Sequence, residues 1–268
     1  MQARSALFDL YGDHLRPRGG EAPVAALVRL LAPLSIAAPA VRTAISRLVR
    51  QGWLTPVRLP AGPGYALTAR GMRRLDEAAA RIYRTNRRDW DGRFDLLVLA
   101  GPVDRAARAR LADTLAYLGF GALSGSTWAA PRRGTVRARD AEVTALLEEL
   151  GVTADRFVAR HGGDHAGAVD LVRRAWDLPA LAEAYREFVA EYTPVVAELP
   201  ADASDEQAYA ARFRLVHAWR TFLFTDPQLP AELLPADWPG ARAAAFFDRY
   251  AGRLRPAADR YVDSCLPR

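Results

Sequence analysis

The segment that most constrains the fold runs from residue 39 to residue 51 and combines an apolar face with a strongly basic one. At about 100° per residue, its aliphatic side chains fall on one side of a helix. These are Val41, Ala44, Ile45 and Leu48. The opposite side carries Arg42, Thr43, Ser46, Arg47 and Arg50. Such a helix packs through its apolar face and leaves a cationic face for solvent or for a polyanion.

The neighbouring segments predict how this helix is packed. Apolar residues at helical spacing indicate helices over residues 4–15 and 24–34. Two short extended runs follow residue 52 on either side of Ala61-Gly62-Pro63-Gly64, and this proline and glycine content is typical of a turn. Thr68 then caps a fourth helix. The order predicts a winged helix-turn-helix, in which the last helix before the hairpin enters the major groove of DNA.

DNA contacts are therefore expected from the polar face of helix 39–51, and from Arg58 of the hairpin near a flanking phosphate. The charge distribution favours the same partner. Residues 1–90 hold 15 arginines against 6 acids, whereas the rest of the chain holds 22 arginines against 25 acids. Only the first third is basic, which indicates a polyanion bound there. Because the chain has no lysine, a single arginine is a weak sign of bidentate recognition.

Length and composition predict a cytoplasmic globular protein without a membrane partner. A chain of 268 residues accommodates one to three domains. No apolar run approaches the roughly 20 residues of a membrane span. Residues 1–15 carry acids and lack the apolar core of a signal peptide. With a single cysteine, Cys265, no internal disulfide is possible.

Two further domains are expected after the first. Residues 89–166 follow the order β-α-β-β-α-β of a ferredoxin-like fold. Residues 167–268 are helical, with a break at Pro179 and a proline-rich segment expected to fix four apolar side chains in a core: Leu229, Leu233, Leu234 and Trp238. The predicted fold class is α+β and multidomain, with a winged helix-turn-helix over 1–88, a ferredoxin-like α/β middle domain over 89–166 and an all-helical C-terminal domain over 167–268.

Several sequence blocks, in order along essentially the whole chain, resemble the PaaX family of bacterial transcriptional repressors. The blocks are VRTAISRLVRQGWL, LTARG, WDGRFDLLVL, GFGALSGSTWAAP, AWDL and HAWRTFLFTDPQLPAELLPADWPG. The founding members repress phenylacetic acid catabolism and release DNA on binding phenylacetyl-CoA. The resemblance implies a homodimer on a palindromic operator of a catabolic operon, released by an acyl-CoA effector such as phenylacetyl-CoA, with no other cofactor. Which acyl-CoA is sensed, the operator sequence and the target genes stay open.

An acyl-CoA site needs arginines for the phosphates and an apolar pocket for the acyl group. Residues 168–250 contain that mixture. The candidate effector-binding residues are Arg173, Arg174, Trp176, Tyr185, Arg212, Phe213, His217, Trp219 and Arg220. The apolar residues of this set also have helical spacing, which is equally typical of side chains that pack in the core. For His217, structural hydrogen bonding, ligand contact and catalysis are all open.

Three rival interpretations predict other functions. The middle domain resembles a small CRISPR-associated nuclease, which needs an acid at the end of its first strand; here Leu99-Ala100-Gly101 end it and Asp95 lies near its start. An acyl-CoA thioesterase is disfavoured because no G-x-S-x-G motif is present. Apart from these rival functions, the sequence leaves open a metal site at His161, Asp164 and His165, although no thiolate accompanies these side chains. We therefore predict no enzyme and no catalytic residue, and assign no residue to a metal. A winged-helix protein–protein adaptor is the third alternative function, after the nuclease and the thioesterase.

Overall fold

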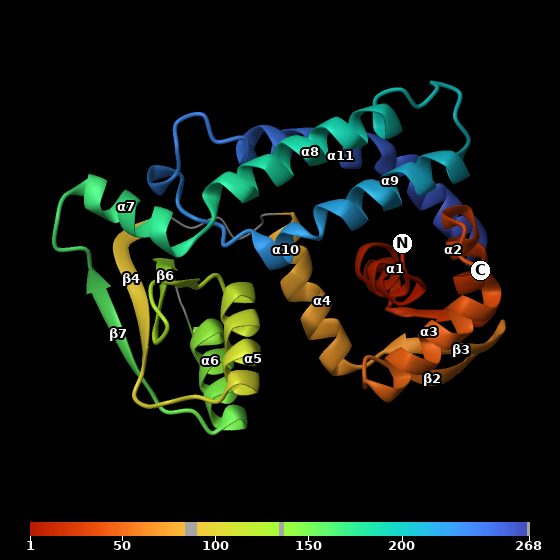
Figure 1. The fold of residues 1–268 in the computed structure, drawn as a ribbon. Coiled ribbons are helices and arrows are strands. Elements are labelled where there is room, and N and C mark those ends of the chain that lie inside the picture. The colour runs from red at the N-terminus through yellow and green to blue at the C-terminus, as the bar shows by residue number, and fades with distance from the viewer. Residues whose placement is uncertain (84–89, 134–136, 267–268) are drawn as a thin grey trace. The chain divides into compact units, whose positions relative to one another are not determined.

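The chain forms a mixed α+β structure that is mostly helical and contains two small antiparallel sheets (Figure 1). The computed structural model describes residues 1–83, 90–133 and 137–266. It divides into two compact units. Unit 1 comprises Met1–Asn86, Phe188–Arg220 and Arg242–Arg268, and unit 2 comprises Arg87–Glu187 and Thr221–Ala241. The fold therefore has two packing units, and each is described by itself.

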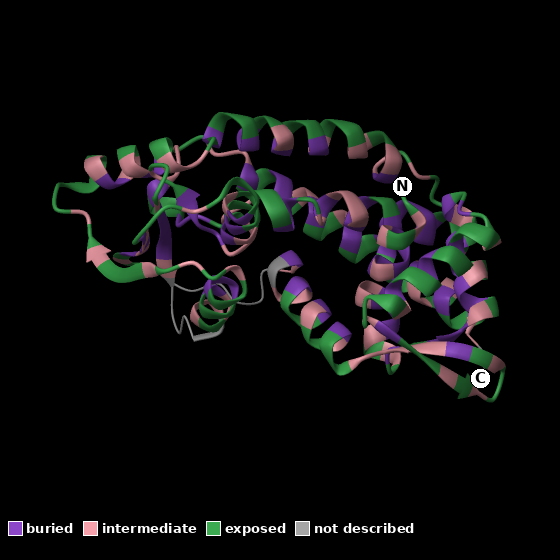
Figure 2. Ribbon diagram, turned by 60° about the horizontal axis from the view of Figure 1, so that its bottom comes forward, coloured by how far each residue is buried: buried purple, intermediate pink, exposed green. Residues whose placement is uncertain are grey.

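The N-terminal part of unit 1 begins with short helical segments, and most of them have one buried face. In chain order they are α1 (Ala3–Leu10), the π-helical turn η1 (Tyr11–Leu15), the 3-10 turn η2 (Arg16–Arg18), α2 (Val24–Leu31), the 3-10 turn η3 (Ala32–Leu34) and α3 (Ala38–Arg50). The predicted helix over 39–51 is confirmed, with Ala37 as its N-cap and Pro39 in its first turn. Such stripes of buried residues along one side of a helix are visible in Figure 2.

A three-stranded sheet in the order β1-β3-β2 completes this part of unit 1. Its strands are β1 (Glu21–Pro23), β2 (Leu54–Leu59) and β3 (Gly62–Leu67). The hairpin pairs Leu54 with Leu67 and Leu59 with Gly62, so the predicted turn is tighter than expected and its glycine has a φ of +113°. Helix α4 (Ala69–Ile82) follows, and the Thr68 side chain accepts a hydrogen bond from the Gly71 N–H at 3.1 Å, as predicted.

Two C-terminal helices share the core of this N-terminal part, namely α9 (Asp205–Trp219) and α11 (Gly240–Cys265). The end of α8 (Leu178–Val196) belongs to the same compact unit. Tyr209, Phe213 and Val262 belong to the same buried cluster as Leu7 and Leu10. The expected boundaries at residues 88 and 166 stay predictions. Compactness groups the chain differently, because α9 and the C-terminal part of α11 bury apolar side chains against the N-terminal helices.

Unit 2 is built on a four-stranded antiparallel sheet in the order β5-β6-β4-β7. Its elements are β4 (Trp90–Leu99), α5 (Arg105–Tyr117), β5 (Gly121–Ala122), β6 (Thr127–Arg133), α6 (Arg137–Leu150) and β7 (Ala154–Arg160). Leu97 and Leu99 face a core that includes Leu111 of α5 and Val143 of α6. The chain order β-α-β-β-α-β is the one expected from the sequence.

The other side of β4 packs against a second core of unit 2. Helix α7 (His165–Ala175) and the 3-10 turn η4 (Ala231–Leu233) contribute to it. The proline-rich segment places Leu229 and Leu233 in this core, with Leu234 and Trp238 partly buried against it, which confirms that prediction. The short helix α10 (Phe222–Thr225) precedes this segment. Among the residues described, no single helix is long and apolar enough to cross a membrane, although α2 with η3 and α3 would pass by length and composition as a pair bent by 120°.

Candidate nucleic-acid interface

Helix α3 presents the two faces that the sequence predicts. Val41, Ala44, Ile45 and Leu48 are buried in the core of unit 1. The opposite side is exposed over Arg42, Thr43, Ser46, Arg47 and Arg50. The amphipathic character of the helix is therefore confirmed, while its contact with DNA stays a prediction.

The arginines of α3 have no acidic partner within the described part of the chain, in contrast to the ion-paired arginines of unit 1. Elsewhere in the unit, Arg16 approaches Asp76 to 2.6 Å and Arg18 approaches Asp263 to 2.8 Å. Arg42, Arg47 and Arg50 form no such ion pair with any described residue. Their guanidinium groups keep their donors for an outside anion, such as a phosphate or the acceptor edge of guanine.

The hydroxyl groups on this face bond to the helix itself. Thr43 Oγ1 donates to the Pro39 carbonyl at 3.0 Å, and Ser46 Oγ donates to the Arg42 carbonyl at 3.1 Å. Both oxygens lie on the exposed side and keep lone pairs that can accept. The face therefore offers guanidinium donors with small hydroxyl groups between them.

The β2–β3 hairpin carries the remaining predicted contact. Arg58 is exposed and lies opposite Pro63, one residue before the end of β2. The hairpin packs closely on β1 because Gly64 has no side chain: a Cβ there would lie 2.7 Å from the Ala22 carbonyl oxygen. This close approach fixes the base of the hairpin that presents Arg58.

The LTARG block, residues 67–71, begins at the end of β3, enters α4 and contacts the turn that follows α3. Thr68 Oγ1 donates to the Gly52 carbonyl at 2.7 Å. A Cβ at Gly71 would lie 2.6 Å from the Trp53 carbonyl oxygen, so only glycine fits there. The guanidinium of Arg70 lies 4.4 Å from the centroid of the Trp53 ring, a cation–π contact. These contacts position α3 from its C-terminal end.

The nine predicted effector-binding residues fall into two groups, one in each unit. The group in unit 1 is Arg212, Phe213, His217, Trp219 and Arg220. Arg212 is 1% exposed and Trp219 stacks on Phe247 with ring centroids 4.8 Å apart. These side chains are packed inside unit 1, so the structure gives them internal partners.

The group in unit 2 is Arg173, Arg174, Trp176 and Tyr185. Arg173 and Arg174 are exposed in the last turn of α7. Trp176 follows that helix and packs against Gly121, where a Cβ would lie 2.5 Å from the indole. Tyr185 stacks on Phe222 at 4.3 Å and donates to Asp226 at 2.6 Å. This group combines exposed arginines with a partly buried ring, Trp176, and a buried ring, Tyr185.

The predicted alternatives for metal or nuclease chemistry have local structural explanations. His161 Nδ1 accepts from the Gly163 N–H at 3.1 Å, Asp164 caps α7 by accepting from the Gly167 N–H, and His165 begins that helix. Among the described residues, no group of three His, Cys, Asp or Glu side chains is arranged to hold a metal ion. Asp95 forms ion pairs with Arg132 at 2.5 Å and with Arg139, so its carboxylate is already compensated by two cations.

Two buried acids of α1 and η1 were missed by the sequence reasoning. Asp9 pairs with His217 and Arg220, and Asp13 pairs with Arg212. The signal that could have found them is their spacing of four residues within an otherwise apolar helix, because a buried carboxylate requires a partner. Their partners lie about 200 positions later in the chain, where the sequence alone gives no pairing.

The sequence and the structure of this chain are similar to those of known proteins. Three family models match successive parts of the chain: PaaX-like protein over residues 2–71, the PaaX protein central Cas2-like domain over 87–169, and the PaaX-like protein C-terminal domain over 176–264. The chain is 34% identical over 266 residues to transcriptional repressor PaaX of Escherichia coli (strain K12), covering 96% of this chain and 82% of that protein. It is also similar to the structure of the uncharacterized protein Rv0674 from Mycobacterium tuberculosis, with a TM-score of 0.61, 26% identity and coverage of 97% of this chain and 98% of that one.

These similarities define the class as a family of transcription regulators rather than of enzymes. Within that class, the chain belongs to the PaaX family of repressors, because the three family models and the curated relative span nearly its whole length.

Proposed function

We propose that this protein is a cytoplasmic DNA-binding repressor of a catabolic operon, with α3 and the β2–β3 hairpin as a winged helix-turn-helix. The observation that carries the proposal is the exposed cationic face of α3, whose arginines have no acidic partner among the described residues. The 34% identity to a transcriptional repressor supports the same function. In this arrangement Arg42, Arg47, Arg50 and Arg58 contact phosphates or guanine, and Thr43 or Ser46 lies over base edges.

A homodimer on a palindromic operator is part of the proposal. A single winged helix contacts too few base pairs for strong specificity, whereas two copies related by a dyad contact half-sites about one or two helical turns apart. Sedimentation at micromolar concentration is expected to show a species of twice 29.4 kDa. A species of 29.4 kDa alone would contradict the dimer.

An acyl-CoA effector, such as phenylacetyl-CoA, is proposed to release the DNA. The exposed arginines of α7, together with Trp176 and Tyr185, suit the phosphates and the acyl group of such a ligand. The candidates in unit 1 require that the ligand reach side chains that already have partners. Arg173→Ala with Arg174→Ala and, separately, His217→Ala therefore distinguish the two groups in a titration with acyl-CoA. Linkage requires that operator DNA weaken acyl-CoA binding by the same factor by which acyl-CoA weakens DNA binding.

The decisive experiment is a gel-shift titration of wild type and Arg42→Ala/Arg47→Ala with duplexes that the wild type selects from random DNA. A lost base contact costs about 1–3 kcal/mol at one position, and a lost phosphate contact weakens binding to all sequences alike. We expect the double variant to bind at least tenfold more weakly, since about 1.4 kcal/mol is tenfold. The matched control is Arg110→Ala, an exposed arginine of α5 in unit 2. Unchanged affinity in the double variant would remove α3 from the proposal.

Salt dependence tests the adaptor alternative. DNA binding through phosphates weakens with a slope of about −0.9 per neutralised phosphate in a plot of log K against log salt concentration. Pairing with a protein through an apolar surface has no such steep slope. Incubation with DNA and Mg²⁺, or with acyl-CoA, exposes a nuclease or a thioesterase directly, and we expect neither product.

A further inference from the structure

Unit 1 contains a row of ion pairs between its N-terminal helices and α9. Asp9 of α1 is 4% exposed and pairs with His217 of α9 and with Arg220, the residue that follows α9. Asp13 of η1 pairs with Arg212, one of the most deeply buried side chains in the unit. The N-terminal third is basic overall, yet the acids it buries at this point all face cations of the C-terminal helix. We call these four residues and His217 the α1–α9 clasp.

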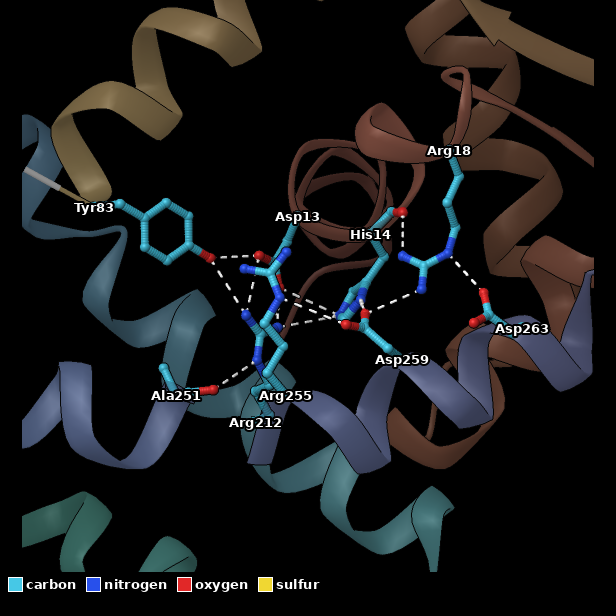
Figure 3. A network of polar contacts seen from close by, with 9 residues as sticks. All are labelled: Asp13, His14, Arg18, Tyr83, Arg212, Ala251, Arg255, Asp259 and Asp263. Carbon is cyan, nitrogen blue, oxygen red and sulfur yellow. Dashed lines mark hydrogen bonds and ion pairs between the residues drawn. The ribbon is translucent and has the colours of Figure 1, made fainter. Parts of the chain in front are cut away.

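Asp13 and Arg212 of the clasp lie in a network of hydrogen bonds and ion pairs (Figure 3). Arg212 Nε donates to the Ala251 carbonyl of α11 at 3.0 Å, and Tyr83 Oη donates to Asp13 Oδ1 at 2.5 Å. Burial alone would raise the pKa of Asp13, but His14 and Arg212 together hold it below its usual value. The carboxylate is therefore charged, and it links η1, α9 and Tyr83, the residue that follows α4, at one point.

A second set of contacts leads from Arg220 to the end of α3. The Arg220 guanidinium lies 5.8 Å from the centroid of the Phe8 ring. The Phe8 ring meets the Trp53 ring edge-on, with centroids 5.7 Å apart. The backbone N–H of Trp53 donates to the Leu48 carbonyl at 2.9 Å, which closes the last turn of α3. The packing is therefore continuous from Arg220, at the end of α9, to the C-terminal end of α3.

From this juxtaposition we propose that Arg220, with Asp9 and Phe8, is a positioning group for DNA recognition: it holds the C-terminal end of α3 at the angle that base contacts require. The inference rests on the proposed function and extends it to residues outside the exposed face of α3, since Asp9 is buried and Phe8 and Arg220 are only partly exposed. It also gives the C-terminal helices a means to act on DNA binding without touching the nucleic acid.

The test compares two variants that disrupt these contacts in different ways. Asp9→Asn/Arg220→Met removes both charges, so no buried charge is left without a partner and the fold is retained. Phe8→Leu keeps both charges and removes only the ring. For each folded variant, binding is measured to a duplex selected by the wild type and to a scrambled duplex, over a range of salt concentrations. Arg214→Met, an exposed arginine on the same helix, is the matched control.

We expect both variants to lose about 2- to 30-fold in the ratio of selected to scrambled affinity, which corresponds to a coupling of about 0.5–2 kcal/mol. The salt slope should stay that of the wild type, because no phosphate contact is lost, whereas Arg47→Ala should reduce it by about 0.9. Arg214→Met should leave both quantities unchanged.

Three outcomes would overturn the inference. Wild-type selectivity in both folded variants shows that the clasp does not position α3. A salt slope reduced by about 0.9 in Asp9→Asn/Arg220→Met shows that Arg220 contacts phosphate directly. A wild-type protein that enriches no sequence from random DNA removes the proposed function and this inference with it, a result distinct from the other two because it appears before any variant is made.

Discussion

The exposed face of α3 and the α1–α9 clasp use the same side chain for opposite purposes. On α3, arginines stand in solvent without a described acidic partner. In the clasp, Arg212 and Arg220 are largely buried and each is held by an aspartate. In a chain without lysine the residue type says nothing about which role an arginine has. Burial and the presence of a carboxylate partner decide it, and the two regions should respond to mutation in opposite ways.

The largest effect is expected from Arg212→Met. This change leaves Asp13 charged and buried without its main partner, and breaking a buried pair in this way costs about 3–5 kcal/mol. Urea unfolding followed by circular dichroism measures it. Asp13→Asn/Arg212→Met should recover most of the loss, because both charges are then gone. Equal losses in the single and double variants would show that packing of the long side chain, rather than the ion pair, stabilises unit 1.

The second-largest effect is expected from low pH, which should lower the unfolding free energy through the clasp and not through the exposed face of α3. The folded-state pKa of Asp13 lies below its ordinary value of about 3.9, so its contribution to stability is complete above that pH and is lost as the pH falls through the lower, folded-state pKa. The neighbouring His14 ring, 3.9 Å away, and the Arg18 guanidinium lower the pKa of Asp259 in the same direction. We expect the unfolding free energy of the wild type to fall below about pH 4, and Asp13→Asn to fall less steeply over the same range. An identical slope in Asp13→Asn would show that Asp13 is not charged in the folded protein.

Local pattern accounts for what the sequence predicted well. The faces of α3, the cap at Thr68 and the core position of Leu229 and Leu233 all follow from spacing within about a dozen residues. The strand and helix order of unit 2 follows for the same reason. The cation–π contact between Arg70 and Trp53 was not predicted, because nothing in the LTARG block shows which aromatic ring its arginine contacts.

The clasp was out of reach for a different physical reason. Arg212, His217 and Arg220 were assigned to an effector because arginines among aromatic residues suit an acyl-CoA, and the helix alone does not show that another helix supplies the anion. The partners Asp9 and Asp13 precede them by about 200 residues, and only the shared core of unit 1 brings them together. Their effector role stays a proposal that must now include the cost of separating them from these acids.

The smallest expected effect lies on α3 and completes the comparison. Arg47 is exposed and has Arg50 three residues later on the same face. Like charges at that spacing on a helix destabilise it by about 0.2–0.5 kcal/mol. Arg47→Gln keeps a good helix former and removes the repulsion, so the unfolding free energy should stay equal or rise by at most about 0.5 kcal/mol. The same preparation, tested on a selected duplex, should bind DNA more weakly. A loss of more than about 1 kcal/mol in stability would mean that Arg47 has a structural partner, and the opposition between a face kept free for DNA and a clasp buried in unit 1 would then fail.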